Sequence, residues 1–286
     1  MNKLADAFEA ERPALVSLCY RMIGERAQAE DAVQETWLKW AQAAHDEIVN
    51  PAAWLRRVAT NIAIDTLRTA YRRRELYVGP WLPEPLISTD GQEPAARFEL
   101  AQECELALLW AMERLTEKER AAFILREAFD ASYGEIANTL SMTEAACRQL
   151  VSRSQRKLQE SGPRFDASPE DVRALSERFF AAVMAEDFDV ALKMMTPDTV
   201  CISDGGARKR AARRPLVGGA EILLMFRAQL DRARGEDGWT IRPGMANSRP
   251  ALLRYRYSVL ESVMTMAPDN RGSIAWFYIL VNPDKF

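Results

Sequence analysis

Histidine is nearly missing from this chain of 286 residues, and cysteine is scarce. The one histidine, His45, argues against histidine-ligated metal sites and against Ser-His or Cys-His nucleophilic catalysis. The four cysteines, Cys19, Cys104, Cys147 and Cys201, are far apart and form no Cys-x-x-Cys pair. Neither a zinc site nor a disulfide framework is predicted, so we expect small buried thiols, no metal and no cofactor.

Long apolar runs are also missing, and no cationic N-terminus leads into an apolar stretch. The longest uninterrupted apolar run, residues 274–281, is too short to span a bilayer, which predicts a cytoplasmic protein without membrane contact. The formal net charge of −3 gives no general attraction to nucleic acid. The charge is uneven, however, because residues 1–50 carry five Lys or Arg against nine Asp or Glu, whereas residues 51–74 carry six Arg against the single Asp65. Such local basic stripes are typical of nucleic-acid-binding proteins.

Residues 132–157 predict two short helices joined by a tight turn, which is the pattern of a DNA-reading helix-turn-helix. Apolar residues between Ile136 and Leu150 form a seam between the helices. The polar side chains that project from the second helix are Arg148, Gln149, Ser152, Arg153 and Arg156. An arginine there can bind guanine or a phosphate. An ordinary helical hairpin with a solvated basic face is the alternative, and Ser141 occupies a turn position that often takes glycine.

The first 76 residues predict a set of amphipathic helices. One of them is expected to begin behind Pro51. Its outward polar residues are Arg56, Arg57, Asn61, Asp65 and Arg68. Trp54 beside this row offers a stacking surface for an unpaired base, although Trp54 taken alone is more typical of a core residue.

Residues 77–98 are rich in proline and glycine and predict a linker. Its segment Trp81-Leu82-Pro83-Glu84-Pro85 is unusual, because a free linker has little use for Trp and Leu, so we expect another part of the protein to cover Trp81. Further along, Thr116 with Glu119 and Ser132 with Glu135 fit the capping box and predict helix starts.

Three stretches together resemble the bacterial extracytoplasmic-function sigma factors. They are residues 29–37 (AEDAVQETW), residues 50–61 (NPAAWLRRVATN) with Asp65 and Arg68, and residues 115–120 (LTEKER), which lead into the helix-turn-helix. The match covers most of residues 10–158. The resemblance implies an alternative sigma factor that binds the beta-prime and beta subunits of core RNA polymerase and directs promoter recognition and DNA melting. Such a protein is no enzyme, since it makes and breaks no bond.

The resemblance also implies a role for each surface. The residues expected to dock on the coiled coil of the polymerase beta-prime subunit are Asp31, Gln34, Glu35 and Trp37. Those expected at the minus-ten promoter element are Trp54, Arg56, Arg57, Asn61, Asp65 and Arg68. The helix with Arg148, Gln149, Ser152, Arg153 and Arg156 is expected at the minus-thirty-five element. The loop 43–50 would hold a flipped base, although His45, Asp46 and Glu47 make it acidic.

After residue 163 the pattern becomes mixed. It predicts helices at 168–183, 188–195 and 222–230, and strands at 199–203, 240–245, 252–258, 259–266 and 273–281, the last buried on both faces. This order resembles the SnoaL-like, nuclear-transport-factor-2-like family. The predicted fold class is therefore multidomain, with two all-α sigma domains and a C-terminal α+β cone. The expected domains are a region 2 domain at 1–76, the linker at 77–98, a region 4 helix-turn-helix domain at 99–161, and a SnoaL-like regulatory domain at 166–286.

Three short motifs resemble those of sigma factors that carry such a domain as a C-terminal extension. The residues expected to make regulatory contacts in cis are Trp81, Pro83, Pro85, Asp204, Gly205, Gly206, Asn282, Pro283, Asp284 and Lys285. Ala207 and Arg208 depart from the family pattern, which favours a third glycine and a lysine. The resemblance implies that the extension contacts the linker and both sigma domains and regulates activity without a separate anti-sigma factor.

Two alternatives belong to other classes. A cone lined by Met225, Trp239, Tyr255 and Trp276 could hold a small-molecule ligand, and a cyclase or isomerase could use Asp204 or Glu261 as its base. The chain would then be a DNA-binding regulator with a ligand-binding or catalytic domain. A conventional ligand-sensing repressor is a third reading, but it would leave the helix with Trp54 and Arg57 unexplained.

Overall fold

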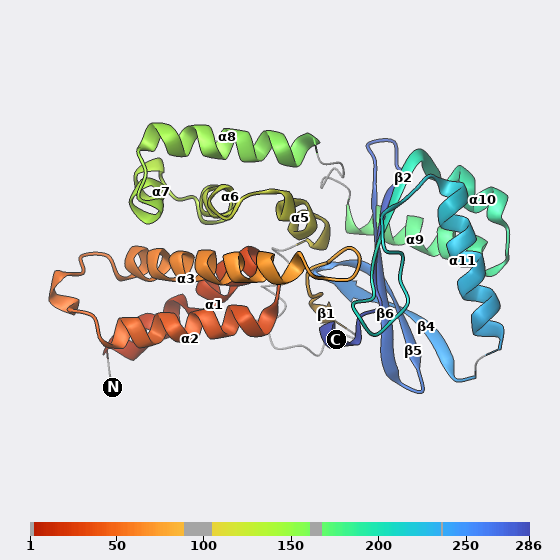
Figure 1. The fold of residues 1–286 in the computed structure, drawn as a ribbon, viewed down its shortest axis with the longest axis horizontal. Helices are drawn as coiled ribbons and strands as arrows, with labels where there is room; N and C mark the ends of the chain where they lie inside the picture. The colour runs from red at the N-terminus through yellow and green to blue at the C-terminus, as the bar shows by residue number, and fades with distance from the viewer. Residues whose placement is uncertain (1–2, 89–104, 161–167, 236) are drawn as a thin grey trace. The chain divides into compact units, whose positions relative to one another are not determined.

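The computed structural model describes residues 3–88, 105–160, 168–235 and 237–286, and they divide into two compact units (Figure 1). The helical unit comprises Met1–Leu76 and Leu109–Ser161, and the α+β unit comprises Tyr77–Leu108 and Gly162–Phe286. The chain therefore passes through the α+β unit between the two halves of the helical unit. The expected all-α and α+β parts are confirmed.

The first half of the helical unit consists of α1 (Lys3–Ile23), α2 (Arg26–Ala41), a 3-10 turn η1 (His45–Glu47) and α3 (Pro51–Arg74). The three α-helices contact one another, and Leu15, Leu18, Leu55 and Leu67 are fully buried among them. Helix α3 begins where the sequence predicts, since the Asn50 side chain accepts a hydrogen bond from the Ala53 amide at 3.1 Å and proline occupies the first turn.

The second half contains η2 (Met112–Arg114), α6 (Glu117–Phe129), α7 (Tyr133–Leu140) and α8 (Glu144–Glu160), after α5 (Leu106–Ala111) at the boundary of the units. Both predicted capping boxes are present, at Thr116 and at Ser132. Helices α7 and α8 form the helix-turn-helix. Ser141 closes its turn in the left-handed conformation with a φ of 53°, so the turn forms without glycine at a modest strain cost.

A buried ionic cluster joins the two halves of the helical unit. The Arg120 side chain on α6 is fully buried and donates to the Arg21 carbonyl on α1 at 3.0 Å and to the Glu113 carboxylate. Glu113 also accepts from Arg74 on α3 at 2.5 Å, and Arg74 donates to the Ile23 carbonyl at 2.7 Å. Removing one partner from such a buried set typically costs about 3–5 kcal/mol, so this cluster is a major contact between the halves.

The α+β unit is built on one mixed sheet. Among the described residues its strands are β1 (Ile87–Ser88), β2 (Met195–Asp204), β3 (Leu216–Val217), β4 (Trp239–Ala246), β5 (Arg249–Arg256), β6 (Val259–Pro268) and β7 (Ile274–Leu280), in the order β1-β4-β5-β6-β7-β2-β3. Strands β2 and β7 are parallel, and the other neighbours are antiparallel. The five strands expected in this domain are confirmed, with some shifts at their ends.

Several predicted boundaries were wrong. The helix expected at 188–195 is α10 (Phe188–Lys193), because Met195 already begins β2. The strand expected to reach Ser258 ends at Arg256, since Tyr257 and Ser258 form a turn with positive φ values of 46° and 71°. Strands β1 and β3 were missed, because two residues are too few to show a period.

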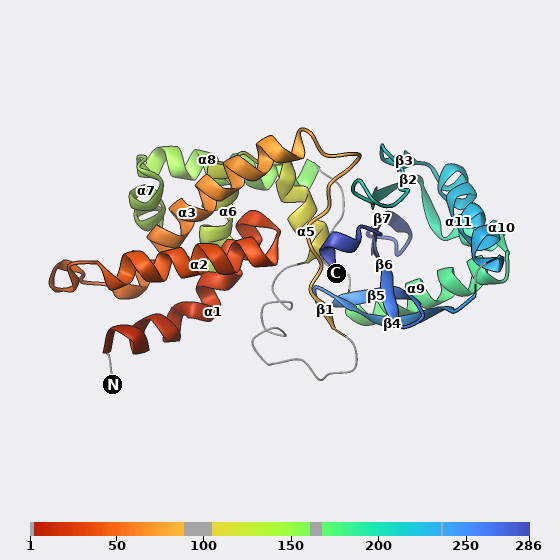
Figure 2. The ribbon, with the colours of Figure 1, turned by 60° about the horizontal axis from the view of Figure 1, so that its bottom comes forward.

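Helices α9 (Pro169–Met184), α10 and α11 (Gly219–Arg234) pack on one face of the sheet (Figure 2). The core between them centres on Phe179, Phe226 and Phe277, whose ring centroids lie 5.0–5.6 Å apart. Tyr278 and Leu280 on the opposite face of β7 are also buried, which confirms that this strand is covered on both faces.

Three of the cysteines, Cys19, Cys147 and Cys201, are buried and free, and Cys104 lies outside the described residues. Burial raises the pKa of Cys19 and of Cys201 to about 12, so these thiols stay protonated. The described part of the chain contains no cluster of potential metal ligands and no helix long and apolar enough to cross a bilayer.

Candidate nucleic-acid interface

Helix α8 separates a buried face from an exposed polar face. Its buried residues include Leu150, Val151 and Ser154, and the Ser154 hydroxyl donates to the Glu119 carbonyl at 3.1 Å. The exposed residues include every predicted reading residue: Arg148, Gln149, Ser152, Arg153 and Arg156. The second helix of the helix-turn-helix therefore presents a continuous row of donors to solvent.

Tyr133 at the start of α7 contacts the first arginine of this row, and sequence reasoning missed it. The guanidinium carbons of Arg126 and Arg148 lie 5.2 Å and 5.3 Å from the centre of its ring. Arg148 also pairs with Glu144 at 3.4 Å, and both side chains are more than half exposed. Such an exposed pair is weak, so Arg148 can exchange it for a phosphate or a base.

Helix α3 carries the second candidate DNA surface. Arg57, Asn61, Asp65 and Arg68 are exposed on it, and Arg56 is half-buried. Arg68 donates to Asp65 at 3.1 Å and to Glu117 of α6 at 2.8 Å. The hydrogen bond from Arg68 lowers the pKa of Glu117. Arg68, a predicted minus-ten residue, is therefore engaged by the other half of the helical unit.

Trp54 lies at the edge of a hollow within the helical unit. Its ring is half-buried, 5.4 Å from the ring of Trp40, which in turn lies 4.3 Å from that of His45. The hollow measures about 730 Å³, and its walls come from residues 43–57 on one side and from α6, α7 and the turn between them on the other. The candidate minus-ten surface thus faces the helix-turn-helix.

Helix α2 presents an acidic face. Asp31, Gln34 and Glu35 are exposed, and Glu35 pairs with Lys39 at 3.0 Å. Trp37 is half-buried with its ring 5.0 Å from that of Phe8, so it packs toward α1 beneath the exposed acidic residues. Leu38, which the sequence analysis missed, is 53% exposed beside these residues. An exposed leucine with polar groups around it fits the apolar centre and polar rim of a protein interface.

The Asp204 carboxylate is the centre of a buried polar cluster, which we call the Asp204 clasp. Asp204 is fully buried at the end of β2. It accepts hydrogen bonds from the Tyr77 hydroxyl at 2.5 Å and from the amides of Leu82 and Gly206 at 2.8 Å and 3.1 Å. The Lys285 ammonium lies 2.7 Å from it. The clasp therefore joins the linker, β2 and the C-terminal residues within the α+β unit.

Residues 77–88, which we call the strap, make further contacts inside this unit. The Lys285 ammonium lies 4.2 Å from the ring centre of the half-buried Trp81 and donates to the Leu82 carbonyl, so the C-terminal residues contact the strap at both positions. The Asn282 side chain donates to the Tyr77 hydroxyl at 2.8 Å. Burial raises the pKa of Tyr77, and its bond to the Asp204 carboxylate raises it further, so Tyr77 remains a donor.

Proline burial and backbone pairing fix the rest of the strap. Pro83 and Pro85 are buried. Leu86 exchanges two hydrogen bonds with Asn247, and β1 pairs with β4. Glu105, at the far end of the same connection, bonds to Arg249 on β5. The described flanks of the connection, residues 77–88 and Glu105, are therefore both anchored on the α+β unit.

The glycines of the Asp204 motif are required by close packing. A Cβ at Gly205 would lie 2.4 Å from the Lys209 carbonyl, and one at Gly206 would lie 2.8 Å from the Asn282 amide nitrogen. Ala207 and Arg208 are exposed, which explains why the departure from the family pattern is tolerated there. Pro283 and Asp284 are exposed as well, and Asp284 pairs with Arg208 at 3.1 Å.

The groups suggested for a cyclase or isomerase are not brought together. Of the four residues expected to line the cone, Trp239 lines the cavity of the α+β unit, whereas Met225, Tyr255 and Trp276 do not. Asp204 is used in the clasp, and Glu261 is ion-paired. The cavity is instead lined by Phe180, Phe226 and aliphatic residues, because Tyr255 alternates to the other face of β5.

Comparison with known proteins assigns these surfaces to a class. Residues 7–73 match the family Sigma-70 region 2, and residues 105–158 match the family Sigma-70, region 4. The helical unit is therefore that of a sigma-70-type factor, with region 2 in its first half and region 4 in its second half.

Full-length relatives define the family more narrowly. The chain is 30% identical over 287 residues to the ECF RNA polymerase sigma factor SigJ of Mycobacterium tuberculosis, covering 98% of this chain and 92% of that protein. It is 34% identical over 284 residues to the probable ECF RNA polymerase sigma factor SigI of the same species, covering 99% and 94%. The crystal structure of SigJ matches with a TM-score of 0.78 and 27% identity, covering 99% of this chain and 98% of that chain. The chain belongs to the extracytoplasmic-function (ECF) sigma factors, and the match to SigJ includes its α+β C-terminal extension.

Asp204→Ala should release the strap from the α+β unit. The substitution removes the acceptor of the Leu82 amide, and a hydrogen bond to a charged group contributes about 1.5–3 kcal/mol. We expect the Leu82 amide to exchange with solvent at least roughly tenfold faster in the full chain, as measured by hydrogen-exchange mass spectrometry. Asp198→Ala, at an exposed position on the same strand, is the control. Equal exchange at Leu82 in both variants would show that the clasp does not hold the strap.

Proposed function

We propose that this sigma factor reads promoter DNA with α3 and α8, docks on core polymerase with α2, and is regulated in cis by its α+β unit. The single observation that carries the regulatory part is the anchored linker, because the connection between the two DNA-binding halves is held by the Asp204 clasp. The functional domains that we propose are region 2 at 1–76, the linker at 77–98, region 4 at 99–161 and the regulatory domain at 166–286.

The two halves must separate on a promoter. The minus-ten and minus-thirty-five elements lie about 25 base pairs apart by their names, which is roughly 85 Å along B-DNA at 3.4 Å per base pair. In the closed helical unit, however, α3 and α6 are in contact through Arg68 and Glu117. Both surfaces therefore cannot occupy their elements while the halves remain packed together.

The clasp limits this separation. Residues 77–104 could span roughly 90 Å as a free extended chain. With Tyr77 in the clasp and Glu105 on Arg249, the two ends of this connection are attached to one body. The α+β unit thereby sets how far the halves can move apart, and no separate anti-sigma factor is needed for this restraint.

DNA recognition divides between affinity and selectivity. The exposed cations of α3 and α8 supply salt-sensitive contacts to phosphates. Base-edge contacts from α8, each contributing about 1–3 kcal/mol, supply the choice of promoter. In this role the protein acts by binding alone and works in the cytoplasm, together with its polymerase.

The acidic face of α2 supports docking on a basic partner surface, which we assign to the beta-prime coiled coil, with region 4 at the beta subunit. Replacing Asp31 by Asn and Gln34 by Ala in one chain should weaken association with core polymerase at least roughly tenfold, since both are exposed at the centre of this face. A pull-down with purified core enzyme measures this. Glu30→Gln, one position away on α2, is the control. Full association of the double variant would contradict the assignment.

Arg148→Ala and Arg153→Ala should each reduce binding at the upstream promoter element by about 1–3 kcal/mol and lower the salt dependence. Both side chains are exposed on α8, and Arg148 also lies 5.3 Å from the centre of the Tyr133 ring. Binding of the polymerase holoenzyme to wild-type and scrambled upstream elements is the measurement, with Arg173→Ala on α9 as the control. If the variants discriminate between the two elements as well as the parent does, α8 is not the reading helix.

A further inference from the structure

The α+β unit contains a cavity with the dimensions of a ligand site. It measures about 380 Å³ and lies between the sheet and helices α9 and α11. Small-molecule sites occupy roughly 300–1,000 Å³. Its floor is apolar, with buried side chains of Phe226, Leu252, Met264 and Ile279. An apolar molecule or segment would lose water-exposed surface on entering it.

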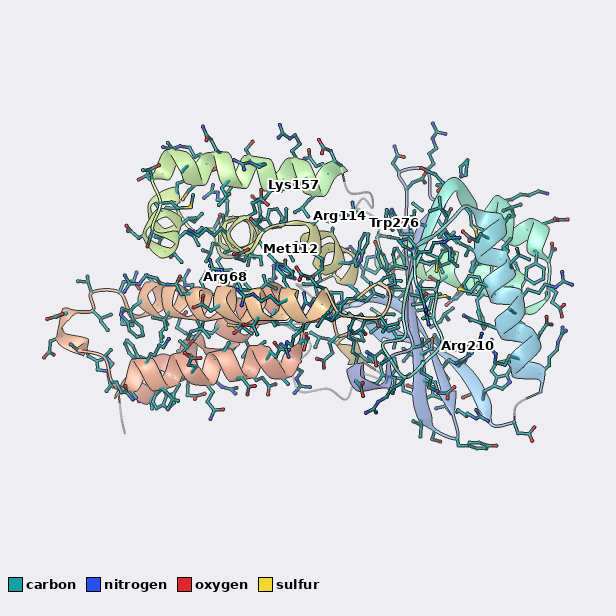
Figure 3. All side chains as sticks on the ribbon, in the orientation of Figure 1. Arg68, Met112, Arg114, Lys157, Arg210 and Trp276 are labelled. Carbon is teal, nitrogen blue, oxygen red and sulfur yellow. The ribbon has the colours of Figure 1, made fainter. Side chains whose placement is uncertain are left out.

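The rim of the cavity is cationic. Of the described residues that line it, six are Lys or Arg and one, Glu261, is acidic. Three of the cations belong to the loop after β2, on which Arg210 is labelled in Figure 3. Arg254 and Arg256 follow Leu252 at alternate positions on β5, so the same strand face changes from apolar floor to cationic rim.

The cations at this rim share few carboxylates, and Arg208 pairs with Asp284 at 3.1 Å. Glu261 pairs with both Lys209, at 3.4 Å, and Arg254, at 3.3 Å. The Nε atom of Arg254 is buried and has no hydrogen-bond acceptor among the described residues. A buried donor without an acceptor costs about 1–3 kcal/mol, so an incoming anion would relieve a penalty that the unliganded protein carries.

We propose that this cavity binds an amphipathic organic anion, with its anionic head at Arg254 and its apolar body on the floor formed by Phe226 and Met264. A guanidinium binds carboxylate and phosphate oxygens through paired hydrogen bonds, which fits either head group. A neutral apolar molecule would leave the buried Arg254 donor without an acceptor. A simple anion would leave the floor empty, and a DNA duplex could contact only the exposed rim and not the floor.

Isothermal titration calorimetry on the full chain tests the ligand class directly. The probes are decanoate and decyl phosphate, used below their aggregation concentrations, with decanol and inorganic phosphate as matched controls. We expect at least one of the two amphipathic anions to bind at least about tenfold more tightly than both controls, because only it satisfies both the rim and the floor. The preferred amphiphile then identifies the head group. Binding of neither amphiphile, equal binding of decanol, or equal binding of inorganic phosphate would each overturn the proposal.

Two substitutions with opposite expected signs separate recognition from a structural effect. Arg254→Gln should weaken the bound amphiphile about tenfold, whereas Glu261→Gln should tighten it, because Lys209 and Arg254 are then released to the ligand. Arg242→Gln, exposed on the opposite face of neighbouring β4, should change nothing. A loss of affinity in both Arg254→Gln and Glu261→Gln, or no change in either, would overturn the proposal. If a variant fails to fold, the probe comparison on the unmodified chain still decides. These measurements need neither polymerase nor promoter, so they are independent of the proposed regulatory role.

Discussion

The buried carboxylate of Asp204 holds the linker on the α+β unit of this sigma factor. Asp204 has no exposure to solvent, so its charge is tolerated only with donors on every side, and it finds them in Tyr77, Leu82, Gly206 and Lys285. Removing one member of such a set leaves an unpaired buried charge, at a cost of several kcal/mol. Three distant parts of the sequence are therefore held together, and the linker becomes part of the α+β unit.

The helical unit depends on a second set of buried ions. The pair between Arg68 and Glu117 is partly exposed and contributes no more than about 1 kcal/mol. The cluster of Arg120, Glu113 and Arg74 is buried, so breaking it costs several times more. The buried cluster therefore contributes more than the surface pair to the packing of region 2 against region 4. In the proposed function, polymerase and promoter supply the free energy that opens it, and the clasp limits the separation that follows.

Local signals explain what the sequence could predict. The capping boxes at Thr116 and Ser132, the exposed face of α8 and the alternation in β7 are each visible within a few residues, and the structure has them where expected. The packing of the two halves through Arg120 was not predictable. In a polar stretch of sequence, an arginine that will be buried cannot be distinguished from one that will be exposed to solvent. Tyr77 was missed because its partner, Asp204, lies 127 positions away in the sequence. The lining of the cavity was partly wrong, because the strand phase that turns Tyr255 away is set by pairing with β4 and β6.

The distance between the two halves of the helical unit tests this account most directly. Double electron–electron resonance would measure it in the full chain, with spin labels at the exposed positions Ala10 and Gln159 and with Arg120→Met added to open the buried cluster. The account predicts a bounded distance distribution while Asp204 is present, and a shift to longer distances when Asp204→Ala is added. Coinciding distributions with and without Asp204→Ala would contradict the claim that the clasp restrains the two halves.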